Sequence, residues 1–240
     1  MGPRLILFDV DQTLIYTNGA GRKSFERALE KMFGISNGLH GVSLSGRTDK
    51  SILYGALEEK KLHHLLTPDV ENQFWDHYLR SLPEHLKTSK NSKILDGIVE
   101  LLTILSETPN VFTGLLTGNI KRGAKTKLEY FDLWKYFPVG AFGDEHPDRN
   151  EVAKIALERS RRHFKEHFSV ENVFVVGDSF NDIECAKAIG ARSIIAATGS
   201  HSYEELHSKK PYSLFLTFAK TAPVLQALQG KPFFEPNGRA

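Results

Sequence analysis

The sequence predicts an α/β fold in which a parallel sheet, covered by helices on both faces, carries an inserted α-helical unit. Three observations lead to this prediction. Short apolar runs of strand length recur along the chain, helical patterns separate most of them, and the interval between the first two runs far exceeds one crossover helix. Parallel strands joined by helices explain the first two observations, and an insertion explains the third.

Four apolar runs are predicted to form the central strands, because their lengths are typical of strands buried on both faces of a sheet. They are "LILF" at 5–8, "FTGLL" at 112–116, "VFVV" at 173–176 and "SIIAA" at 193–197. The segment "PYSLFLTF" at 211–218 is predicted to add a strand. The segment "APVLQALQG" is predicted to form a closing helix that ends at Gly230.

Two amphipathic helices are predicted in the long interval. Apolar residues recur there at the three- and four-residue spacing of a helix face: Phe25, Ala28, Leu29, Met32 and Phe33, then Val70, Phe74, Trp75, Tyr78, Leu79 and Leu82. Thr67 is placed to cap the second helix, and Pro68 suits its first turn. Residues 17–89 are therefore predicted to form a helical cap domain, inserted into an α/β core of residues 1–16 and 90–240. The polar connections "YTNGAG" and "TSKNSK" suit hinges, although ordinary loops have the same composition.

The composition argues against nucleic-acid and membrane partners. The 31 Lys and Arg residues nearly balance the 29 Asp and Glu residues, so the chain lacks the basic excess typical of nucleic-acid binding. No apolar run approaches the ~18 residues of a membrane span. The single cysteine, Cys185, is expected to be buried and cannot form an internal disulfide, which fits a cytoplasmic protein. The N-terminus shows no secretion signal.

Small polar and acidic residues follow three of the predicted strands directly. Asp9 and Asp11 follow the first strand, "TGN" at 117–119 follows the second, and "GDSFND" at 177–182 includes Asp178 and Asp182. The carboxyl ends of parallel strands share one edge of a sheet, where ligands bind in open α/β folds. These three groups are therefore expected to meet in one crevice.

The carboxylates in this crevice need a cation. Two such charges 4 Å apart repel each other by about 4 kcal/mol in a protein-like medium. Oxygen ligands from carboxylates, a backbone carbonyl and water suit a hard ion, and Mg²⁺ is the one expected where a phosphate completes the coordination shell. The sequence thus predicts Mg²⁺ as the cofactor.

Asp9 and Asp11 can have different tasks. A carboxylate beside Mg²⁺ is a feasible nucleophile for phosphorus, and a second carboxyl away from the metal can protonate the leaving oxygen and later deprotonate water. Asp9 fits the nucleophile and Asp11 the acid/base, although paired aspartates also cap turns. Thr117, Gly118 and Asn119 offer a hydroxyl, a close backbone approach and an amide to phosphoryl oxygens.

The motifs "DVDQTL", "LLTGN" and "VVGDSFND", in this order, resemble those of the haloacid dehalogenase superfamily. The resemblance is to its phosphoglycolate phosphatase-like branch, which has a helical cap, and it implies a Rossmann-like core. It implies that Asp9 forms a phosphoaspartyl intermediate. It further implies that the Asp11 carbonyl and the Asp9 and Asp178 carboxylates bind Mg²⁺, that Thr117 holds the phosphoryl group, and that Ser179 and Asp182 support the metal site.

Two positions depart from the pattern of that superfamily. Gln12 stands where members usually have glycine, and the lysine of the third motif is missing from "FGDEHPDRNEVAKIALERS". Arg149, before the predicted helix, and Lys154, within it, are the candidates to replace that lysine. Arg149 is favoured because a guanidinium pairs well with carboxylate and phosphate oxygens.

The predicted activity is hydrolysis of a small phosphorylated metabolite, of the phosphoglycolate or sugar-phosphate type. In the predicted cap, Arg47 of "SGRTDKSI" is a candidate for substrate specificity, although pairing with Asp49 or simple exposure is equally compatible with the sequence. Three alternatives stay open: phosphoglucomutase-type transfer, phosphonate hydrolysis with a cap lysine, and a binding module without turnover. Asp9, Asp11 and Asp178 weigh against the last.

Overall fold

The central element of the fold is a six-stranded, wholly parallel sheet. The structure, a computed structural model, describes residues 2–42 and 44–235. Within these residues the strand order is β5-β4-β1-β6-β7-β8. The strands are β1 (Arg4–Phe8), β4 (Val111–Leu116), β5 (Gly140–Ala141), β6 (Val173–Gly177), β7 (Arg192–Ala196) and β8 (Ser213–Phe215). The predicted α/β class is confirmed, and five of the six strands lie within or across the predicted runs.

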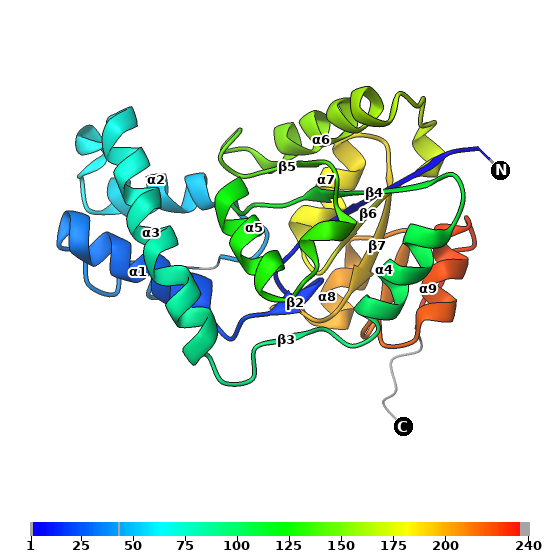
Figure 1. Ribbon diagram of the computed structural model, residues 1–240, viewed down its shortest axis with the longest axis horizontal. Helices are drawn as coiled ribbons and strands as arrows, with labels where there is room; N and C mark the ends of the chain where they lie inside the picture. The colour runs from blue at the N-terminus through cyan, green and yellow to red at the C-terminus, as the bar shows by residue number, and fades with distance from the viewer. Residues whose placement is uncertain (1, 43, 236–240) are drawn as a thin grey trace.

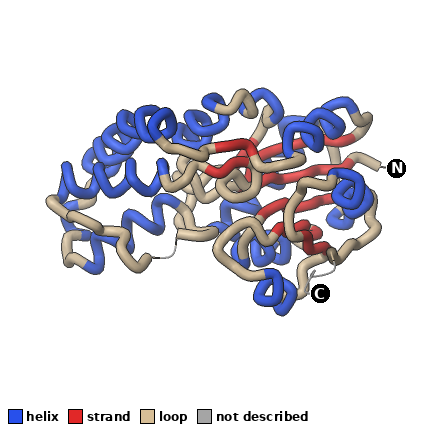
Figure 2. The backbone as a smooth tube through the Cα atoms, turned by 90° about the horizontal axis from the view of Figure 1, so that it is seen from below, coloured by secondary structure: helices blue, strands red, loops and turns tan. Residues whose placement is uncertain are grey.

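Alternate residues of the central strand β1 face two hydrophobic layers. Ile6 and Phe8 join the cluster formed with α4 (Ile98–Glu107), α5 (Lys121–Tyr130) and α9 (Thr221–Leu228). Leu5 and Leu7 join the cluster on the other face, formed with α6 (Arg149–Phe164) and α7 (Phe180–Ala188), where Cys185 is buried. The short α8 (Tyr203–Ser208) packs beside β8. Helices therefore cover both faces of the sheet (Figures 1 and 2).

The register of the sheet aligns the strand ends that carry polar residues. Phe8 of β1 lies opposite Leu115 of β4 and Val176 of β6. The backbone N–H of Asp9 continues this pairing by donating to the Val176 carbonyl at 2.9 Å. The residues that follow β1, β4 and β6 therefore emerge at one edge of the sheet, as the sequence predicts.

The inserted segment forms helices with a hydrophobic core of their own. They are α1 (Ala20–Phe33), α2 (Asp49–Glu59) and α3 (Pro68–Thr88), with a short 3₁₀ turn, His63–Leu65, before α3. Two further 3₁₀ turns, Trp134–Tyr136 and Val170–Asn172, lie in the sheet domain. The Phe25 ring of α1 contacts the rings of Phe74, Trp75 and Tyr78 of α3. The two predicted amphipathic patterns thus lie on α1 and α3, and the Thr67 hydroxyl caps α3 by accepting from the Val70 N–H at 3.3 Å. Figure 1 shows this helical unit beside the sheet domain.

The two connections to the helical unit are bonded to each other. The strands β2 (Ile15–Tyr16) and β3 (Lys93–Ile94) form an antiparallel pair where the chain leaves and re-enters the sheet domain. The Asn18 amide donates to the Lys90 carbonyl at 2.8 Å, and the Ser89 hydroxyl donates to the Thr17 carbonyl at 2.9 Å. Both segments therefore act as one junction.

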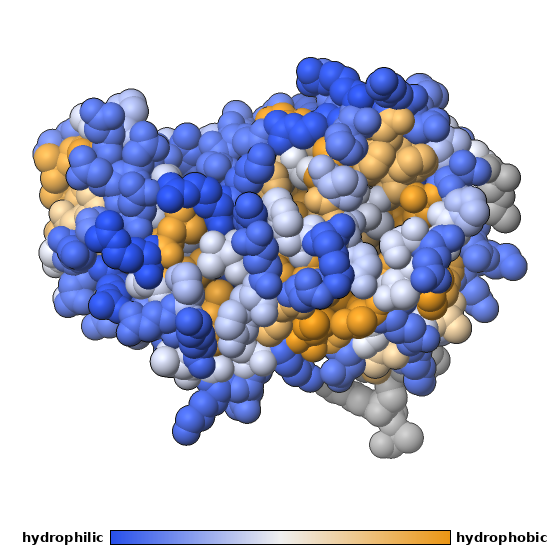
Figure 3. Space-filling view, in the orientation of Figure 1, coloured by the Kyte–Doolittle hydropathy of each residue, from blue (hydrophilic) through white to orange (hydrophobic). Residues whose placement is uncertain are grey.

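The surface shows no extended apolar belt over the helical unit in the view of Figure 3, where polar residues cover most of that unit. Among residues 2–42 and 44–235, none of the helices has the length and apolar character needed to cross a bilayer. Large apolar side chains with more than 40% exposure in this part of the chain are scattered: Leu65, Val99, Tyr130, Val170 and Phe234. Scattered exposure of this kind is ordinary for globular proteins.

Candidate active site

The three groups of polar residues meet in a cavity of about 450 Å³ between the strand ends and the helical unit. Thr13, after β1, donates to an Asp178 carboxylate oxygen at 3.1 Å, and Asn119, after β4, donates to Asp11 at 2.8 Å. The sheet domain and the helical unit both line the cavity: Asp9, Asp11, Asn119, Arg149 and Asp178 from the former, Phe25, Leu44, Ile52 and Tyr78 from the latter. The structure thus brings the sequence-predicted residues of all three groups together.

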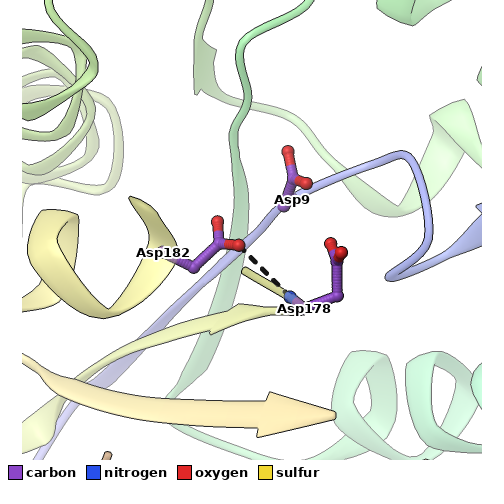
Figure 4. A group of neighbouring side chains, drawn as sticks. All are labelled: Asp9, Asp178 and Asp182. Carbon is purple, nitrogen blue, oxygen red and sulfur yellow. Dashed lines mark hydrogen bonds between the residues drawn. The ribbon is translucent and has the colours of Figure 1, made fainter. Parts of the chain in front are cut away.

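Three buried carboxylates form an acidic cluster (Figure 4), and two of them, Asp9 and Asp178, line the cavity. One oxygen each of Asp9, Asp178 and Asp182 lies within 4.8 Å of the others. Burial raises the pKa of Asp9 to about 7, although the Arg149 guanidinium opposes that rise. Burial and the neighbouring Asp182 also raise the pKa of Asp178 well above its ordinary value. The Arg149 guanidinium therefore does not fully offset the burial of these two carboxylates, and a bound cation would supply the remaining counter-charge.

Asp182 is already engaged by the protein. Its Oδ2 accepts from the N–H of Asp178, shown as the dashed line in Figure 4, and from the N–H and hydroxyl of Ser179 at 2.9 and 2.6 Å. The contact with the Ser179 N–H belongs to the capping box that begins α7, in which the Asp182 N–H donates to the Ser179 hydroxyl oxygen at 3.4 Å. Both oxygens of Asp182 are thus engaged, by Arg149 and by Ser179, which leaves the oxygens of Asp9 and Asp178 as the freer ligands of the cluster.

This donor set fits a hard divalent cation. Asp9 and Asp178 offer buried carboxylate oxygens whose raised pKa values show that an added positive charge would be favourable there. Oxygen ligands of this kind suit Mg²⁺. The residues that are present therefore match the cofactor predicted from the sequence.

Asp11 lies in a different environment from Asp9. Its Oδ2 accepts from the Lys127 ammonium at 2.6 Å and from the Asn119 amide at 2.8 Å. Its side chain keeps 37% of its surface exposed at the cavity wall, whereas the Asp9 side chain keeps 9%. Both aspartates that follow β1 line the cavity, but the Asp9 carboxylate is buried and the Asp11 carboxylate is exposed.

Gln12 adopts the left-handed backbone conformation that explains why glycine is expected there. Its φ is +63°, its N–H donates to the Ile15 carbonyl at 2.8 Å, and its carbonyl accepts from the Thr198 hydroxyl at 2.5 Å. A non-glycine residue in this conformation costs on the order of 1 kcal/mol. The turn between Asp11 and Ile15 therefore forms although position 12 is glutamine and not glycine. Gln12 also lines the cavity.

The turn after β4 is covered by the loop that begins α2. A Cβ atom on Gly118 would lie 2.0 Å from the Arg47 carbonyl oxygen, so this contact requires glycine. The Asp49 N–H donates to the Gly118 carbonyl at 2.7 Å, and the Asp49 carboxylate accepts from the Ile120 N–H at 2.9 Å. The Thr117 hydroxyl accepts from the Asn119 amide at 2.9 Å, which fixes the turn from within. The helical unit therefore rests directly on residues 117–120.

The positions of Arg149 and Lys154 distinguish the two candidates for the third-motif cation. The Arg149 guanidinium is buried, with Nη2 at 2.9 Å from Asp9 and at 2.6 Å from Asp182. Its Nε has no hydrogen-bond partner among the described residues. Lys154 lies on the exposed side of α6, paired with Glu151 at 2.7 Å. Only Arg149 reaches the carboxylates.

Arg47 lies at the rim of the cavity. Its guanidinium donates to the Ser51 carbonyl at 2.9 Å and is exposed, and its backbone contacts the Gly118 turn. Pairing of Arg47 with Asp49, which the sequence also allows, is not among the ion pairs of the described residues.

A protein-family model that matches most of the chain shows which family the chain belongs to. The model described as haloacid dehalogenase-like hydrolase matches residues 6–196, from β1 through β7. The chain belongs to this hydrolase family. The resemblance drawn from the three motifs is thereby confirmed.

Relatives of this hydrolase carry names that are provisional assignments. A protein of Caldanaerobacter subterraneus subsp. tengcongensis, named pyrophosphatase PpaX, is 29% identical over 213 residues, which cover 86% of this chain and 87% of that protein. A Haemophilus somnus structure, named a phosphoglycolate phosphatase, has a TM-score of 0.68 at 20% identity and covers 93% of this chain and 98% of its own. A Thermotoga maritima structure, named a β-phosphoglucomutase, has a TM-score of 0.61 at 23% identity, over 93% and 99%. The two structures share the fold of this hydrolase.

Two residues of the hydrolase's site are missing from the sequence-based prediction of site residues. Lys127 lies in the basic segment "KRGAKTK", which looks like a solvated helix face, yet it shares the buried face of α5 with Ala124 and Leu128. That lysine on an apolar stripe is the signal that could have found it. Asp49 follows a good cap residue, Thr48, but its contact with residue 120 depends on tertiary structure.

Replacement of Asp49 by asparagine is expected to change the pH dependence of stability in this hydrolase. Burial, opposed by the Lys127 ammonium, raises the pKa of Asp49 to about 6, whereas an unfolded aspartate titrates near pH ~4. The folded protein therefore holds a proton that the unfolded chain has released, and this group's contribution to stability falls as pH rises through that window.

Asp49 keeps part of its surface exposed to solvent, which weakens the full effect. The stability of the wild type relative to Asp49→Asn should thus decrease by on the order of 1 kcal/mol between about pH 4 and about pH 7. Urea unfolding of both proteins across this range measures the difference. Asp96→Asn, at an exposed aspartate, is the matched control. A constant difference between wild type and Asp49→Asn would contradict the assignment.

Proposed function

We propose that this hydrolase is a Mg²⁺-dependent phosphatase that acts on a small phosphorylated metabolite through an aspartyl-phosphate intermediate. The observation that carries the proposal is the contrast between the two aspartates after β1. Asp9 is buried beside Asp178 and Arg149, whereas Asp11 faces the cavity and is held by Lys127 and Asn119. Two carboxyl groups in such different environments suit two different roles.

The proposed reaction begins at Asp9. A carboxylate oxygen of Asp9 forms a bond to phosphorus while the bond from phosphorus to the leaving oxygen breaks. The leaving oxygen keeps that electron pair and takes the proton of the Asp11 carboxyl group. The Asp11 carboxylate then removes a proton from water as the water oxygen attacks phosphorus. The bond to Asp9 breaks, which releases inorganic phosphate and restores both carboxyl groups.

The remaining site residues would hold the phosphoryl group and the cation. Mg²⁺ would be held by the Asp9 and Asp178 carboxylates and the Asp11 carbonyl, and when bound it would offset the charge of the phosphoryl oxygens. Thr117, Gly118 and Asn119 would contact phosphoryl oxygens. The Thr117 hydroxyl oxygen accepts a hydrogen bond from the Asn119 amide, so its own proton remains available for a bond to a phosphoryl oxygen. Arg149 would orient Asp9, and Ser179 and Asp182 would support the site from behind.

The helical unit of residues 17–89 is proposed to act as the cap of this site. Its loop at residues 44–49 contacts the turn at residues 117–120, and its side chains line one wall of the cavity. A unit that closes over the phosphoryl group excludes bulk water before attack and strengthens the electrostatic interactions inside. The paired junction of β2 with β3 would serve as its hinge.

The substrate is proposed to be a phosphoglycolate or sugar phosphate, or a phosphate ester of similar size, in the cytoplasm. A cavity of about 450 Å³ holds a phosphoryl group with a compact leaving group. Arg47, at the rim of the cavity, could bind a second anionic group of the substrate. The names of the relatives, a pyrophosphatase and a phosphoglycolate phosphatase, support phosphorylated small molecules as the substrate class.

Purified protein is expected to release inorganic phosphate from such esters only when Mg²⁺ is present. A panel of phosphoglycolate, hexose phosphates, pyrophosphate and an aryl phosphate, each assayed with Mg²⁺ and with a chelator, measures both substrate range and metal dependence. Product analysis separates the alternatives, because a mutase would return an isomerised sugar phosphate and a phosphonate hydrolase would need a carbon–phosphorus substrate. Absence of metal-dependent phosphate release across the panel would contradict the proposal.

A further inference from the structure

Lys127 contacts the proposed acid/base directly, although it lies outside the three motifs. Its ammonium lies 2.6 Å from Oδ2 of Asp11 and 2.5 Å from Oδ1 of Asn119. The Asn119 amide in turn donates to the same Asp11 oxygen at 2.8 Å. The three side chains thus form a closed ring of contacts around one oxygen of Asp11.

This arrangement leaves the other Asp11 oxygen for the substrate. No hydrogen bond of the described residues engages Oδ1 of Asp11, and the side chain lines the cavity with 37% of its surface exposed. We propose that Lys127 is a positioning residue that, together with Asn119, holds Oδ2 of Asp11 so that Oδ1 faces the leaving oxygen of the phosphate ester. The inference rests on the proposed phosphatase function.

The burial of Lys127 supports a specific role. Its side chain is 5% exposed, and taking an ammonium out of water is strongly unfavourable unless charged and polar partners compensate. Burial would lower the pKa of Lys127, but Asp11, Tyr78 and Asp49 together outweigh it and raise that pKa above its ordinary value. Lys127 is therefore a fixed cation whose closest anionic partner is Asp11.

Residues of α1 and α3 in the helical unit pack close to Lys127. A Cβ atom on Gly21 of α1 would lie 3.2 Å from the Lys127 nitrogen, so the backbone of α1 approaches the ammonium closely. The Tyr78 ring of α3 lies against Gly123 of α5, and its hydroxyl is near the same point of α1. Side chains locked in this way by packing hold a reactive group within the narrow range that proton transfer requires.

The role of Lys127 should appear in the dependence of rate on the leaving group. As the bond from phosphorus to the leaving oxygen breaks, an alkoxide must take the proton of Asp11, whereas a nitrophenolate departs readily without it. The parameter kcat/KM reports the steps through departure of the leaving group, before water attacks. Misplacement of Asp11 therefore lowers kcat/KM for an alkyl phosphate more than for a nitrophenyl phosphate.

The test compares wild type, Lys127→Met and the control Lys125→Met with Mg²⁺, using p-nitrophenyl phosphate and glycerol phosphate. Lys125 lies on the same helix, exposed and paired with Glu129. Lys127→Met is expected to lower kcat/KM for glycerol phosphate at least ~10-fold more than for p-nitrophenyl phosphate, since general acid catalysis supplies roughly 10² to 10⁴ in rate. Lys125→Met should change neither value, and Lys127→Arg should recover part of the loss on glycerol phosphate.

A double-mutant cycle completes the experiment. In an Asp11→Asn background, Lys127→Met should have no further effect that depends on the leaving group, because the group it positions is gone. Equal losses on the two esters would overturn the inference and leave the phosphatase function standing, whereas wild-type protein without Mg²⁺-dependent activity on these two esters and on the whole substrate panel would overturn both. Circular dichroism monitors folding, and Lys127→Gln, judged by the same two criteria, replaces any Lys127→Met protein that does not fold.

Discussion

Asp9→Asn is expected to reduce phosphate release by about 10⁴-fold or more, as loss of an essential nucleophile does in other hydrolases. Asparagine keeps the size of the side chain but offers no carboxylate to form an acyl phosphate. The substitution also removes one of the two freer oxygen ligands proposed for Mg²⁺, beside Asp178. Acid quenching of wild type during turnover should trap phosphoprotein, and the variant should give none.

The same substitution is expected to leave the fold intact. Burial raises the pKa of Asp9 to about 7, so the folded state disfavours the carboxylate relative to the unfolded chain. The contribution of this group to stability is present at low pH and is lost as pH rises through about 7. At higher pH and without metal, Asp9→Asn should therefore unfold at a temperature no lower than that of wild type.

Thermal unfolding at about pH 8, with a chelator present, measures this expectation. Asp96→Asn makes the same chemical change at an exposed position and should affect neither activity nor unfolding temperature. An Asp9→Asn protein that turns over at the wild-type rate would contradict the assignment of the nucleophile. Loss of activity together with greater stability is the trade-off expected of a buried catalytic charge.

The strands that position Asp9 could be predicted, because their wholly apolar composition indicates burial on both faces of the sheet. The runs at 5–8 and 173–176 are apolar at every position, and their register places Asp9 beside the end of β6. The strand β5 could not be predicted, because its two residues, Gly140 and Ala141, become a strand only by pairing with β4. Helix α2 was also missed as a helix, although Thr48 and its apolar residues at 52, 53, 56 and 57 are a readable pattern.

The acidic cluster follows from the sequence, but the cations around it do not. Asp9 and Asp178 each follow a buried strand, so the order of the sheet is enough to bring them together. Lys127 comes from a helix that looks solvated, and its contact with Asp11 depends on how α5 packs beneath α1 and α3. Side-chain pairs that connect distant helices leave no periodic signal in a single sequence.

Arg149→Met is expected to destabilise the protein by about 3–5 kcal/mol and to lower phosphatase activity at the same time. The Arg149 guanidinium is the buried cation between Asp9 and Asp182, at 2.9 and 2.6 Å. Methionine fills a similar volume but leaves both buried carboxylates without that partner. Urea unfolding and phosphate release measure the two effects, and saturating Mg²⁺ should recover part of the lost stability by binding the Asp9 carboxylate.

Lys154→Met is the matched control, because it removes a cation from the same helix at an exposed position. Its effect on stability should stay within about 0.5 kcal/mol, with no change in activity. Arg149→Lys should fall between wild type and Arg149→Met, since one ammonium can reach a carboxylate but cannot reproduce the planar fork of donors. Loss of activity in Lys154→Met with full activity in Arg149→Met would reverse the assignment. Burial explains why Arg149→Met should be more harmful than Lys154→Met. When Arg149 is removed, water cannot reach Asp9 and Asp182 to replace the lost partner, whereas water can solvate Glu151 when Lys154 is removed.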